Sequence, residues 1–573
     1  MRVRKTHQGL TLQATAGSYV VVLGMNMSKA DCNGLMGFAI HRTDHEEQEA
    51  YWMEGIKTFE ETDPGFAPGA KYPTNKHPIQ GFTWSDFSAK PGRRYTYRIQ
   101  ALRGPPPDLQ KFKEVSVDVN TESTEGGNHD VFFNRGAAAS QEYARRFQNR
   151  RPDEANPDDP RWAWLSRGAM EAIEAFVARA RDGSWGLRGA AYEFRLDLFA
   201  NALFAAHQRG ADVRITFDAC DNPPDEHGKV FPRDDNRATA RAAQIKSLCI
   251  ERITRDDVQN PPISHHKFIV LLKNGKPKAV LTGSTNFSRG GVFGQSNVVH
   301  VVEDATVAKA YLKCWELIAA NPVHEDLRGD LSAMNRLPEE KPPKGTIAIF
   351  SPQKTRQALD WYGALASGAE DALFMTFAFG INKVFLDVYK TGKAKLRYAL
   401  LDKLLAPGVR KEQKPAAEKA MRELRFMKEN RFAVGNKIST NAFDRWLSEK
   451  LPGLNTHVQF IHTKFMLVDP LGDDPIVVTG SANFSDASTL QNDENMLVIR
   501  GNKRVADIYL GEYLRLWNHY AFREWVASKP VPSEARPQFL KTDNKWWREY
   551  FDDTDRSRQR QYFSGSTNEP PFA

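Results

Sequence analysis

The sequence contains few cysteines and no long apolar stretch. Only four cysteines occur in 573 residues, at positions 32, 220, 249 and 314. Their wide separation argues against a zinc-binding CxxC pair or a disulfide framework and indicates free thiols in a reducing compartment. No run of 18 or more apolar residues is present, so no transmembrane helix is expected. The basic N-terminus also lacks an apolar segment of signal-peptide length, and we therefore expect a cytoplasmic protein.

An excess of positive charge is confined to one segment. The formal net charge is +8, but residues 390–437 hold 14 Lys or Arg and five Asp or Glu, which gives this segment a local charge of +9. The formal net charge of the rest of the chain is therefore −1. Such a segment is either a solvated basic helix face or a surface that contacts the phosphate backbone of a nucleic acid.

A long internal repeat is the most informative feature of the sequence. "HHKFIVLLKNGKPKAVLTGSTNFS", residues 265–288, aligns without a gap with "HTKFMLVDPLGDDPIVVTGSANFS", residues 462–485. The offset is 197 residues, and 11 of the 24 positions are identical. Because this period is far longer than the repeat of a solenoid, it indicates two copies of a whole domain.

The order of predicted elements divides the chain into five segments. Short strands separated by turn signals predict an all-β sandwich, loosely resembling a fibronectin type III module, over residues 1–120. A linker is expected at 121–159. Helices that alternate with buried strands then predict two α/β halves with covered sheets, at 160–340 and 345–530. A tail rich in Pro, Trp and charge follows at 531–573, and we expect it to wrap around the body.

The first part of the repeated motif places two functional groups on one face of a strand. Residues i and i+2 of a strand point the same way, so His265 and Lys267 share a face, as do His462 and Lys464. His266 then points to the other side. The apolar runs that follow are typical of fully buried strands.

The second part of the motif places small polar groups at the end of the next strand. Glycine permits close backbone approach there, and serine and asparagine supply neutral hydrogen-bonding groups. The residues are Gly283, Ser284 and Asn286 in the first copy, and Gly480, Ser481 and Asn483 in the second.

These groups together suit the cleavage of a phosphate diester. Two lysines neutralise the non-bridging oxygens, and Ser and Asn side chains donate to them as charge grows in the transition state. One imidazole can attack phosphorus while the other protonates the leaving oxygen. Asp469 and Glu494 are the carboxylates available to raise the pKa of the second histidine. The scheme requires no metal and no organic cofactor.

The motif pair resembles the phospholipase D superfamily. The second copy carries the full pattern: His462, Lys464, Asp469, Gly480, Ser481, Asn483 and Glu494. The first copy departs from it, because Leu272 stands where the family has aspartate and Asn297, near Gln295, stands where the second copy has Glu494. The tyrosyl-DNA phosphodiesterase branch departs in a similar way, so activity is still expected.

The resemblance implies two halves that form one pseudo-symmetric site in a cleft, a covalent phosphohistidine, and no metal. By the same resemblance His265 is the nucleophile and His462 the general acid. Asn286, Asn483, both lysines and the two carboxylates would complete the catalytic set. We expect Ser284, Ser481, Gln295 and Asn297 to bind substrate.

The sequence leaves the substrate open. The first hypothesis is a nuclease acting on DNA or RNA, because the basic segment lies between the two motifs and no export signal is evident. The alternative is a phospholipase D that hydrolyses phosphatidyl headgroups. A third hypothesis is a binding scaffold with a degenerate site. The sandwich is expected to dock a partner or substrate that the sequence does not identify.

Overall fold

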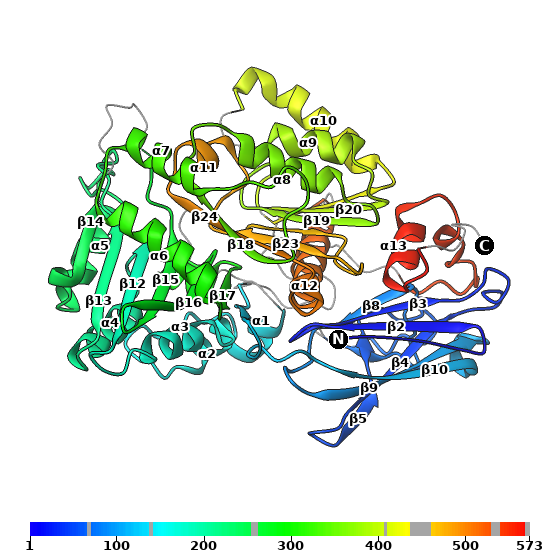
Figure 1. Cartoon of the computed structure of the whole chain (residues 1–573). Coiled ribbons are helices and arrows are strands. Elements are labelled where there is room, and N and C mark those ends of the chain that lie inside the picture. The colour runs from blue at the N-terminus through cyan, green and yellow to red at the C-terminus, as the bar shows by residue number, and fades with distance from the viewer. Residues whose placement is uncertain are drawn as a thin grey trace.

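The fold is described from a computed structural model of the chain. The described residues are 1–65, 70–136, 141–253, 262–405, 409–435, 460–528 and 539–567. They form an N-terminal β-sandwich, two α/β halves and a C-terminal tail (Figure 1).

The N-terminal sandwich consists of two four-stranded sheets in which all strand pairs are antiparallel. One sheet has the order β1 (Arg2–His7), β2 (Leu10–Ala16), β3 (Val21–Asn26) and β8 (Thr83–Asp86). The other has the order β10 (Gln110–Asn120), β9 (Arg94–Arg103), β4 (Gly37–Asp44) and β5 (Glu49–Trp52). Apolar side chains from both sheets fill the core between them.

One contact in the sandwich is typical of immunoglobulin-like sandwiches. The hydroxyl of Tyr95, near the start of β9, accepts a hydrogen bond from the backbone N–H of Lys90 at 2.9 Å. A tyrosine that bonds back to the chain a few residues upstream at this corner is a hallmark of that architecture. The narrower resemblance to fibronectin type III stays a prediction.

The first α/β half is built on a seven-stranded mixed sheet. Its order is β11 (His129–Phe133), β17 (Val298–Val302), β16 (Lys276–Gly283), β15 (Lys267–Lys273), β12 (Trp185–Ala191), β13 (Asp212–Asp218) and β14 (Cys249–Arg252). The pairs β12–β13 and β13–β14 are parallel, and the other four pairs are antiparallel.

The second half repeats this topology strand for strand. Its order is β18 (Gly345–Ser351), β24 (Glu494–Arg500), β23 (Ile476–Gly480), β22 (Phe465–Val468), β19 (Ala372–Phe377), β20 (Leu396–Leu401) and β21 (Asn430–Val434). The parallel and antiparallel pairs fall at the same places. The predicted mixed α/β fold with two repeated halves is therefore confirmed.

Three hydrophobic cores bind the two sheets and their helices into layers. In β15, Phe268 and Val270 belong to the core shared by both halves, whereas Ile269 belongs to the outer core of the first half. The shared core also takes side chains from α6 (Ala305–Ala319) and α12 (Lys503–Ala527). The strands are apolar on both faces because both faces are covered.

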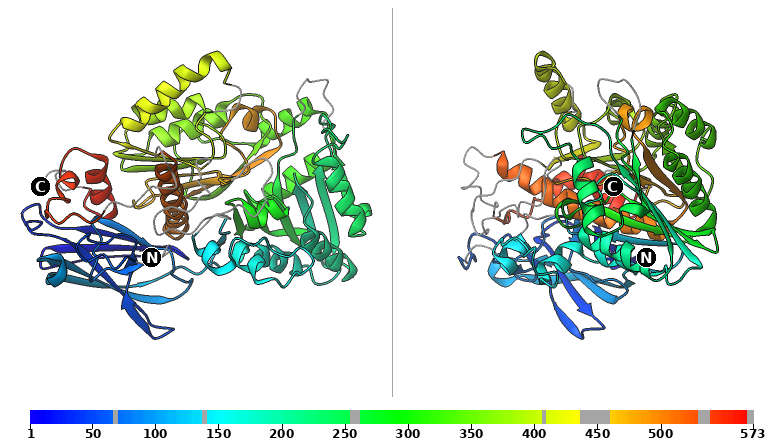
Figure 2. Two further views of the ribbon diagram at one scale, coloured as in Figure 1. Left: turned by 180° about the vertical axis from the view of Figure 1, so that it is seen from behind. Right: turned by 90° about the vertical axis from the view of Figure 1, so that its left-hand side faces the viewer.

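The outer faces of the sheets are covered by further helices (Figure 2). In the first half these are α3 (Ala169–Ala178), α4 (Asp197–Gln208) and α5 (Arg233–Ala242). In the second half they are α8 (Gln357–Ser367), α9 (Lys383–Thr391) and α10 (Lys414–Phe426). Four further helices complete the two halves: α1 (Gln141–Phe147), α2 (Pro160–Ser166), α7 (His324–Met334) and α11 (Asp486–Leu490).

The segment 121–159 is not a simple linker, which corrects the sequence-based boundary. Strand β11 lies within it and forms the edge of the first α/β sheet. Asn134 directly follows this strand. Its side-chain Nδ2 donates to the carbonyl of Val292 at 2.8 Å, and its Oδ1 accepts from the N–H of Asn297 at 2.8 Å. The segment therefore supports the loop that carries part of the motif.

The described part of the tail packs mainly on the sandwich. Trp546, Trp547, Tyr550 and Phe551 belong to the sandwich core. The indole N–H of Trp546 donates to the carbonyl of Leu35 at 2.9 Å. Helix α13 (Asp555–Phe563) lies between the sandwich and the second half (Figure 1). The tail thus completes the core of a domain whose strands come from the opposite end of the sequence.

Among the described helices, none combines the length and the apolar character that crossing a membrane would require.

Candidate active site

The two halves meet through a pair of matching backbone bridges. Ser264 pairs with Asp493, and Ser296 pairs with Ile461, each as a single parallel β-bridge. Ser264 and Ile461 occupy equivalent positions of the sequence repeat, as do Ser296 and Asp493. Each segment that leads into the first histidine of a repeated motif is therefore fixed to the opposite half at the same place.

This junction brings His265 against Glu494, on the first residue of β24. The Nδ1 atom of His265 lies 2.9 Å from both carboxylate oxygens of Glu494. Both side chains are buried. Burial holds the pKa of His265 well below its usual value, and the nearby lysine charges lower it further. His265 is therefore neutral near pH 7, and a carboxylate on Nδ1–H leaves the lone pair on Nε2.

His462 makes the corresponding contact with Asn297. Its Nδ1 lies 2.9 Å from Oδ1 of Asn297. The amide Nδ2 of Asn297 donates to the carbonyl of Gly291 at 2.8 Å, which directs Oδ1 toward the histidine. An amide oxygen only accepts, so Nδ1 of His462 carries the proton. Asn297 therefore orients His462, and its expected role in substrate binding is corrected to this one.

The ring centres of His265 and His462 are 6.5 Å apart. Reacting atoms in a productive complex stand about 3–3.5 Å apart, so a single phosphate can contact both rings. Burial, followed by the charges of Lys464 and Lys267, also lowers the pKa of His462 well below its usual value.

Lys267 and Lys464 supply positive charge beside the histidines. The Nζ of Lys267 donates to the carbonyl of His265 at 2.7 Å, and that of Lys464 to the carbonyl of His462 at 2.6 Å. Within the described part of the chain, each buried ammonium has only this one hydrogen-bond acceptor. Burial lowers the pKa of Lys267 to about 8 and lowers that of Lys464 strongly. A bound anion would offset the cost of burying both charges.

The glycines of the repeated motif permit close contact between neighbouring strands. A Cβ atom on Gly283, at φ +134°, would lie 2.2 Å from the carbonyl oxygen of Val298. A Cβ on Gly480 would lie 2.1 Å from the carbonyl oxygen of Asn495. Any other residue would push β17 or β24 away from its neighbour and shift the residues that contact the histidines.

The serines of the motif act inside the protein, which corrects the expectation that they bind substrate. Oγ of Ser284 accepts from the N–H of Val298 at 3.1 Å and donates to Oδ1 of Asn297 at 2.8 Å. Oγ of Ser481 accepts from the N–H of Asn495 at 3.0 Å. Both serines therefore fix the start of the last sheet strand in their half.

The asparagines of the motif are better placed to meet a ligand. Asn286 is buried and Asn483 is half-buried. Among the described residues, Oδ1 of each has no hydrogen-bond partner. A buried amide oxygen without a partner is costly, so a hydrogen-bond donor on a bound ligand is the expected partner for both. Gln295 lies at the end of a short π-helix, Gly290–Gly294, where its backbone N–H donates to the carbonyl of Gly290 at 2.8 Å.

Asp469 contacts neither histidine, which corrects its expected catalytic role. It follows the C-terminal end of β22, whereas His462 precedes the N-terminal end. Its Oδ1 accepts from the N–H groups of Asp371 at 2.7 Å and Ala372 at 2.8 Å. The carboxylate therefore holds the start of β19.

His266 points away from the other two histidines, as the strand alternation predicts. Its Nδ1 lies 3.3 Å from Oδ1 of Asn495, and its Nε2 lies 3.8 Å from the sulfur of Cys314. The ring packs edge-on against Phe268, with ring centres 5.2 Å apart. These contacts place it in the shared core.

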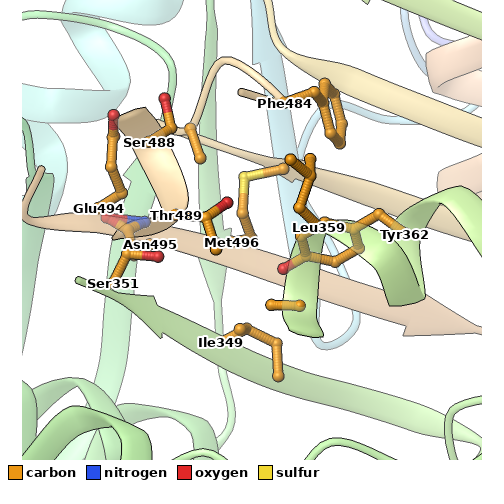
Figure 3. Close-up of a pocket in the computed structure, with 12 residues that line it drawn as sticks. Ile349, Ser351, Leu359, Tyr362, Phe484, Ser488, Thr489, Glu494, Asn495 and Met496 are labelled. Carbon is orange, nitrogen blue, oxygen red and sulfur yellow. The ribbon is translucent and has the colours of Figure 1, made fainter. Parts of the chain in front are cut away.

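A small, mainly apolar cavity adjoins Glu494. The cavity of about 10 Å³ lies beside Glu494 and is lined mainly by apolar groups from α8, β18 and the loop after β23. Leu359 and Tyr362 on α8 lie on the side away from Glu494 (Figure 3). The space is at the lower limit for one water, so it is no substrate pocket. Burial in this setting raises the pKa of Glu494 to about 7.

An aromatic side chain that was not predicted from the sequence lies beside the site. The ring of Tyr192, directly after β12, packs edge-on against His265 with centres 4.9 Å apart. Nζ of Lys267 lies 5.4 Å from its centre. The strand register puts Ala378 at the corresponding position of the second half. The feature of the sequence that could have indicated Tyr192 is a polar aromatic residue directly after a buried strand.

The basic segment is partly neutralised in the folded chain. Arg425 pairs with Glu524 at 2.7 Å, Arg431 with Asp555 at 2.9 Å and Lys395 with Asp371 at 2.9 Å, while Lys428 pairs with Asp553. Two of these acids come from the tail. The exposed residues Arg410, Lys411 and Lys414, before and at the start of α10, have no acidic partner among the described residues.

A family model described as "Cardiolipin synthase, PLD-like domain" matches residues 186–316 and 411–517. These segments contain most elements of the two halves and both histidine motifs. The match supports the phospholipase D superfamily and a phosphodiesterase type of enzyme.

A curated protein is similar in sequence to part of this chain. A phospholipase D of Rickettsia conorii is 28% identical over 125 residues, which are 22% of this chain and 52% of that protein. The chain thus spans about half the length of the curated relative that it matches.

Solved structures with similarity to the chain have low sequence identity. Phosphatidylserine synthase of Haemophilus influenzae is 12% identical at a TM-score of 0.40, over 64% of this chain and 89% of that one. Yeast tyrosyl-DNA phosphodiesterase is 12% identical at a TM-score of 0.31, over 58% and 88%. Nuc of Salmonella typhimurium is 20% identical at a TM-score of 0.21, over 30% and 93%.

Proposed function

We propose that this protein is a phosphodiesterase that works through a covalent phosphohistidine on His265 and requires no metal ion. The observation that carries the proposal is the contact between Nδ1 of His265 and the carboxylate of Glu494, at 2.9 Å. It sets a neutral imidazole with a free Nε2 beside two buried ammonium groups, which is the arrangement a phosphodiester needs.

In the first step Nε2 of His265 attacks phosphorus and the bond from phosphorus to the leaving oxygen breaks. His462 gives its Nε2 proton to that oxygen. The positive charge that develops on His265 is stabilised by Glu494, and Lys267 and Lys464 stabilise the phosphoryl oxygens. The products of this step are the free alcohol and a phosphohistidine that still carries the other substituent.

In the second step a water molecule attacks the phosphohistidine. Neutral His462 accepts the proton of this water, the N–P bond breaks, and its electron pair returns to Nε2 of His265. His462 needs a proton to act as the acid, although burial lowers its pKa in the empty site. The negative charge of a bound diester raises this pKa, so substrate binding itself supplies the condition for protonation.

We propose nucleic acid as the substrate. The exposed cations at the start of α10 suit a phosphate backbone, and the half-buried ring of Tyr192 offers a stacking surface for a base next to His265. A phospholipid is the second candidate, because the matching family model is named for cardiolipin synthase and the curated relative for phospholipase D.

A panel of substrates in excess EDTA tests this proposal. Purified protein is offered bis(p-nitrophenyl) phosphate, single-stranded DNA, duplex DNA, RNA and phosphatidylcholine vesicles. We expect hydrolysis of the simple diester and of a nucleic acid without added metal. If phosphatidylcholine alone were hydrolysed, the substrate would be a phospholipid and not a nucleic acid. Complete loss in EDTA that a divalent ion restores would overturn the mechanism.

A further inference from the structure

Two buried carboxylates lie behind the histidine motifs. Asp218 is the last residue of β13, and Asp402 directly follows β20. The strand register makes them equivalent, because the residue before each pairs with the last residue of the neighbouring central strand, β12 or β19. Their spacing along the chain differs from that of the two histidine motifs, so the gapless sequence repeat did not reveal them.

Each carboxylate holds the backbone directly before a catalytic histidine. Oδ2 of Asp218 accepts from the N–H of Ser264 at 2.6 Å. Oδ1 of Asp402 accepts from the N–H of Ile461 at 2.9 Å. Ser264 and Ile461 are the residues that form the two bridges between the halves. The same hydrogen bond, from a backbone N–H to a buried aspartate, therefore occurs once in each half.

A carboxylate that is buried to accept a backbone hydrogen bond carries a large desolvation cost. Asp218 and Asp402 are both 0% exposed, and neither forms an ion pair with a Lys or Arg in the described chain. Oδ2 of Asp402 has no hydrogen-bond partner there. Burial raises the pKa of Asp218 to about 7 and also raises the pKa of Asp402, so the two carboxylates become charged toward neutral and alkaline pH. An asparagine could accept the same N–H without any cost of a buried charge, so the presence of a carboxylate requires an explanation.

Asp218 and Asp402 each act electrostatically on one of the two lysines. Glu494, Glu193 and Asp218 all raise the pKa of Lys267 against the lowering effect of burial. For Lys464, burial and Lys267 lower the pKa, whereas Glu494 and Asp402 raise it. His265 and Tyr192 are the other titratable groups next to Lys267. Each half thus pairs one lysine with one buried aspartate.

We propose that Asp218 and Asp402 are positioning residues for the reaction. They fix the backbone that presents His265 and His462, and their charges keep Lys267 and Lys464 protonated for phosphate binding. The inference rests on the proposed function, because it assigns these residues a role at the same site.

Asparagine and alanine variants separate the two tasks. Asp218→Asn and Asp402→Asn keep an acceptor but lose the charge, so the alkaline limb of kcat/KM for bis(p-nitrophenyl) phosphate should move about 1 pH unit lower. KM should rise more than kcat falls at pH 8. The Ala variants also lose the acceptor, and kcat should fall at every pH. Asp218→Glu keeps the charge and should keep the alkaline limb of the unaltered protein.

Asp86→Asn is the matched control for loss of a buried carboxylate. Asp86 lies in the sandwich, where it accepts from Arg42 at 2.8 Å and from the hydroxyl of Tyr97 at 2.7 Å. This variant should lower the melting temperature and leave the pH profile unchanged. A change in its profile equal to that of the Asn variants would show that the shift reflects stability alone and would overturn the proposal.

Sulfate binding measured by calorimetry gives a readout that does not need turnover. The charge of sulfate is constant between pH 6.5 and 9. Glu494 and Asp218, whose pKa values are both raised to about 7, are largely ionised by pH 8, so a further fall in affinity above pH 8 reports loss of the ammonium groups. We expect this fall at lower pH in each Asn variant that melts cooperatively, and the two positions serve as replicates. Curves that superimpose on those of the unaltered protein would overturn the inference. Failure of the unaltered protein to cleave any diester would instead overturn the proposed function.

Discussion

The Nδ1 atom of His265, in the first half, lies 2.9 Å from the carboxylate of Glu494, in the second half. His462 meets Asn297 in the same way at 2.9 Å. Glu494 and Asn297 occupy equivalent positions of the sequence repeat. Each histidine is therefore oriented by the opposite half, one by a carboxylate and the other by an amide. This difference makes the two histidines chemically inequivalent.

The nucleophile assignment predicts that His265→Asn abolishes formation of an acid-labile phosphoenzyme, because no other imidazole of the described chain lies within hydrogen-bond distance of Glu494. The measurement is trapping of labelled phosphate after rapid acid-free quenching. His266→Asn is the neighbouring control, since His266 packs into the shared core and should change activity far less. A dispensable His265 together with an essential His266 would contradict the assignment.

The pH dependence of kcat/KM follows from two shifted groups. Protonation of Glu494, whose pKa is raised to about 7, removes the acceptor that keeps Nδ1 protonated, so activity should fall as the pH drops below about 7. Loss of the proton from Lys267, whose pKa is lowered to about 8, should reduce activity above that pH. We therefore expect a bell-shaped profile with a maximum between these values.

Glu494→Gln tests the origin of the acid limb of this profile. The amide of Gln can donate to Nδ1 and favour the tautomer with the proton on Nε2, so kcat should fall by about 10²–10⁴-fold. The acid limb of the kcat/KM profile, near pH 7, should also shift. An unaltered profile would show that Glu494 does not control the nucleophile.

Asp469 is expected to contribute to stability and not to the chemical step. Asp469→Ala removes an acceptor for backbone N–H groups at the start of β19 and should lower the free energy of unfolding by about 1–3 kcal/mol. Asp469→Asn should be milder, because Asn keeps one acceptor and tolerates the φ of +46° at this position. Chemical denaturation measures the first effect. A large loss of kcat in folded Asp469→Asn would contradict this assignment.

The basic segment makes a prediction about salt dependence. If Arg410, Lys411 and Lys414 all contact phosphates, replacing the three by Ala should reduce the log–log salt slope of duplex DNA binding by about 2 to 3. Affinity should fall alike on every sequence, because phosphate contacts do not specify bases. Lys395→Ala is a control, since Lys395 is paired with Asp371 in the folded chain. Equal slopes for the triple variant and the unaltered protein would favour the phospholipid alternative.

The repeat made the architecture of the two halves predictable. Its two copies fall on β15–β16 and β22–β23, in the centre of two sheets with the same strand order. Strand β11 escaped prediction because it is a short edge strand whose partner, β17, lies far later in the chain. No local pattern reports a partner so distant. The same holds for Trp546, whose place in the sandwich core depends on a contact with Leu35.

The sequence alone identified the histidines and lysines of the site. The alternation of side chains along a strand placed His265 and Lys267 together and turned His266 away, because that geometry is local. Tertiary structure decided which residue each group meets. Glu494 reaches His265 because the two halves meet at paired backbone bridges. Asp469 reaches the start of β19 because β22 and β19 are neighbours in the second sheet. The chemical polarity of the site is thus a property of the junction between the halves, and neither half contains it by itself.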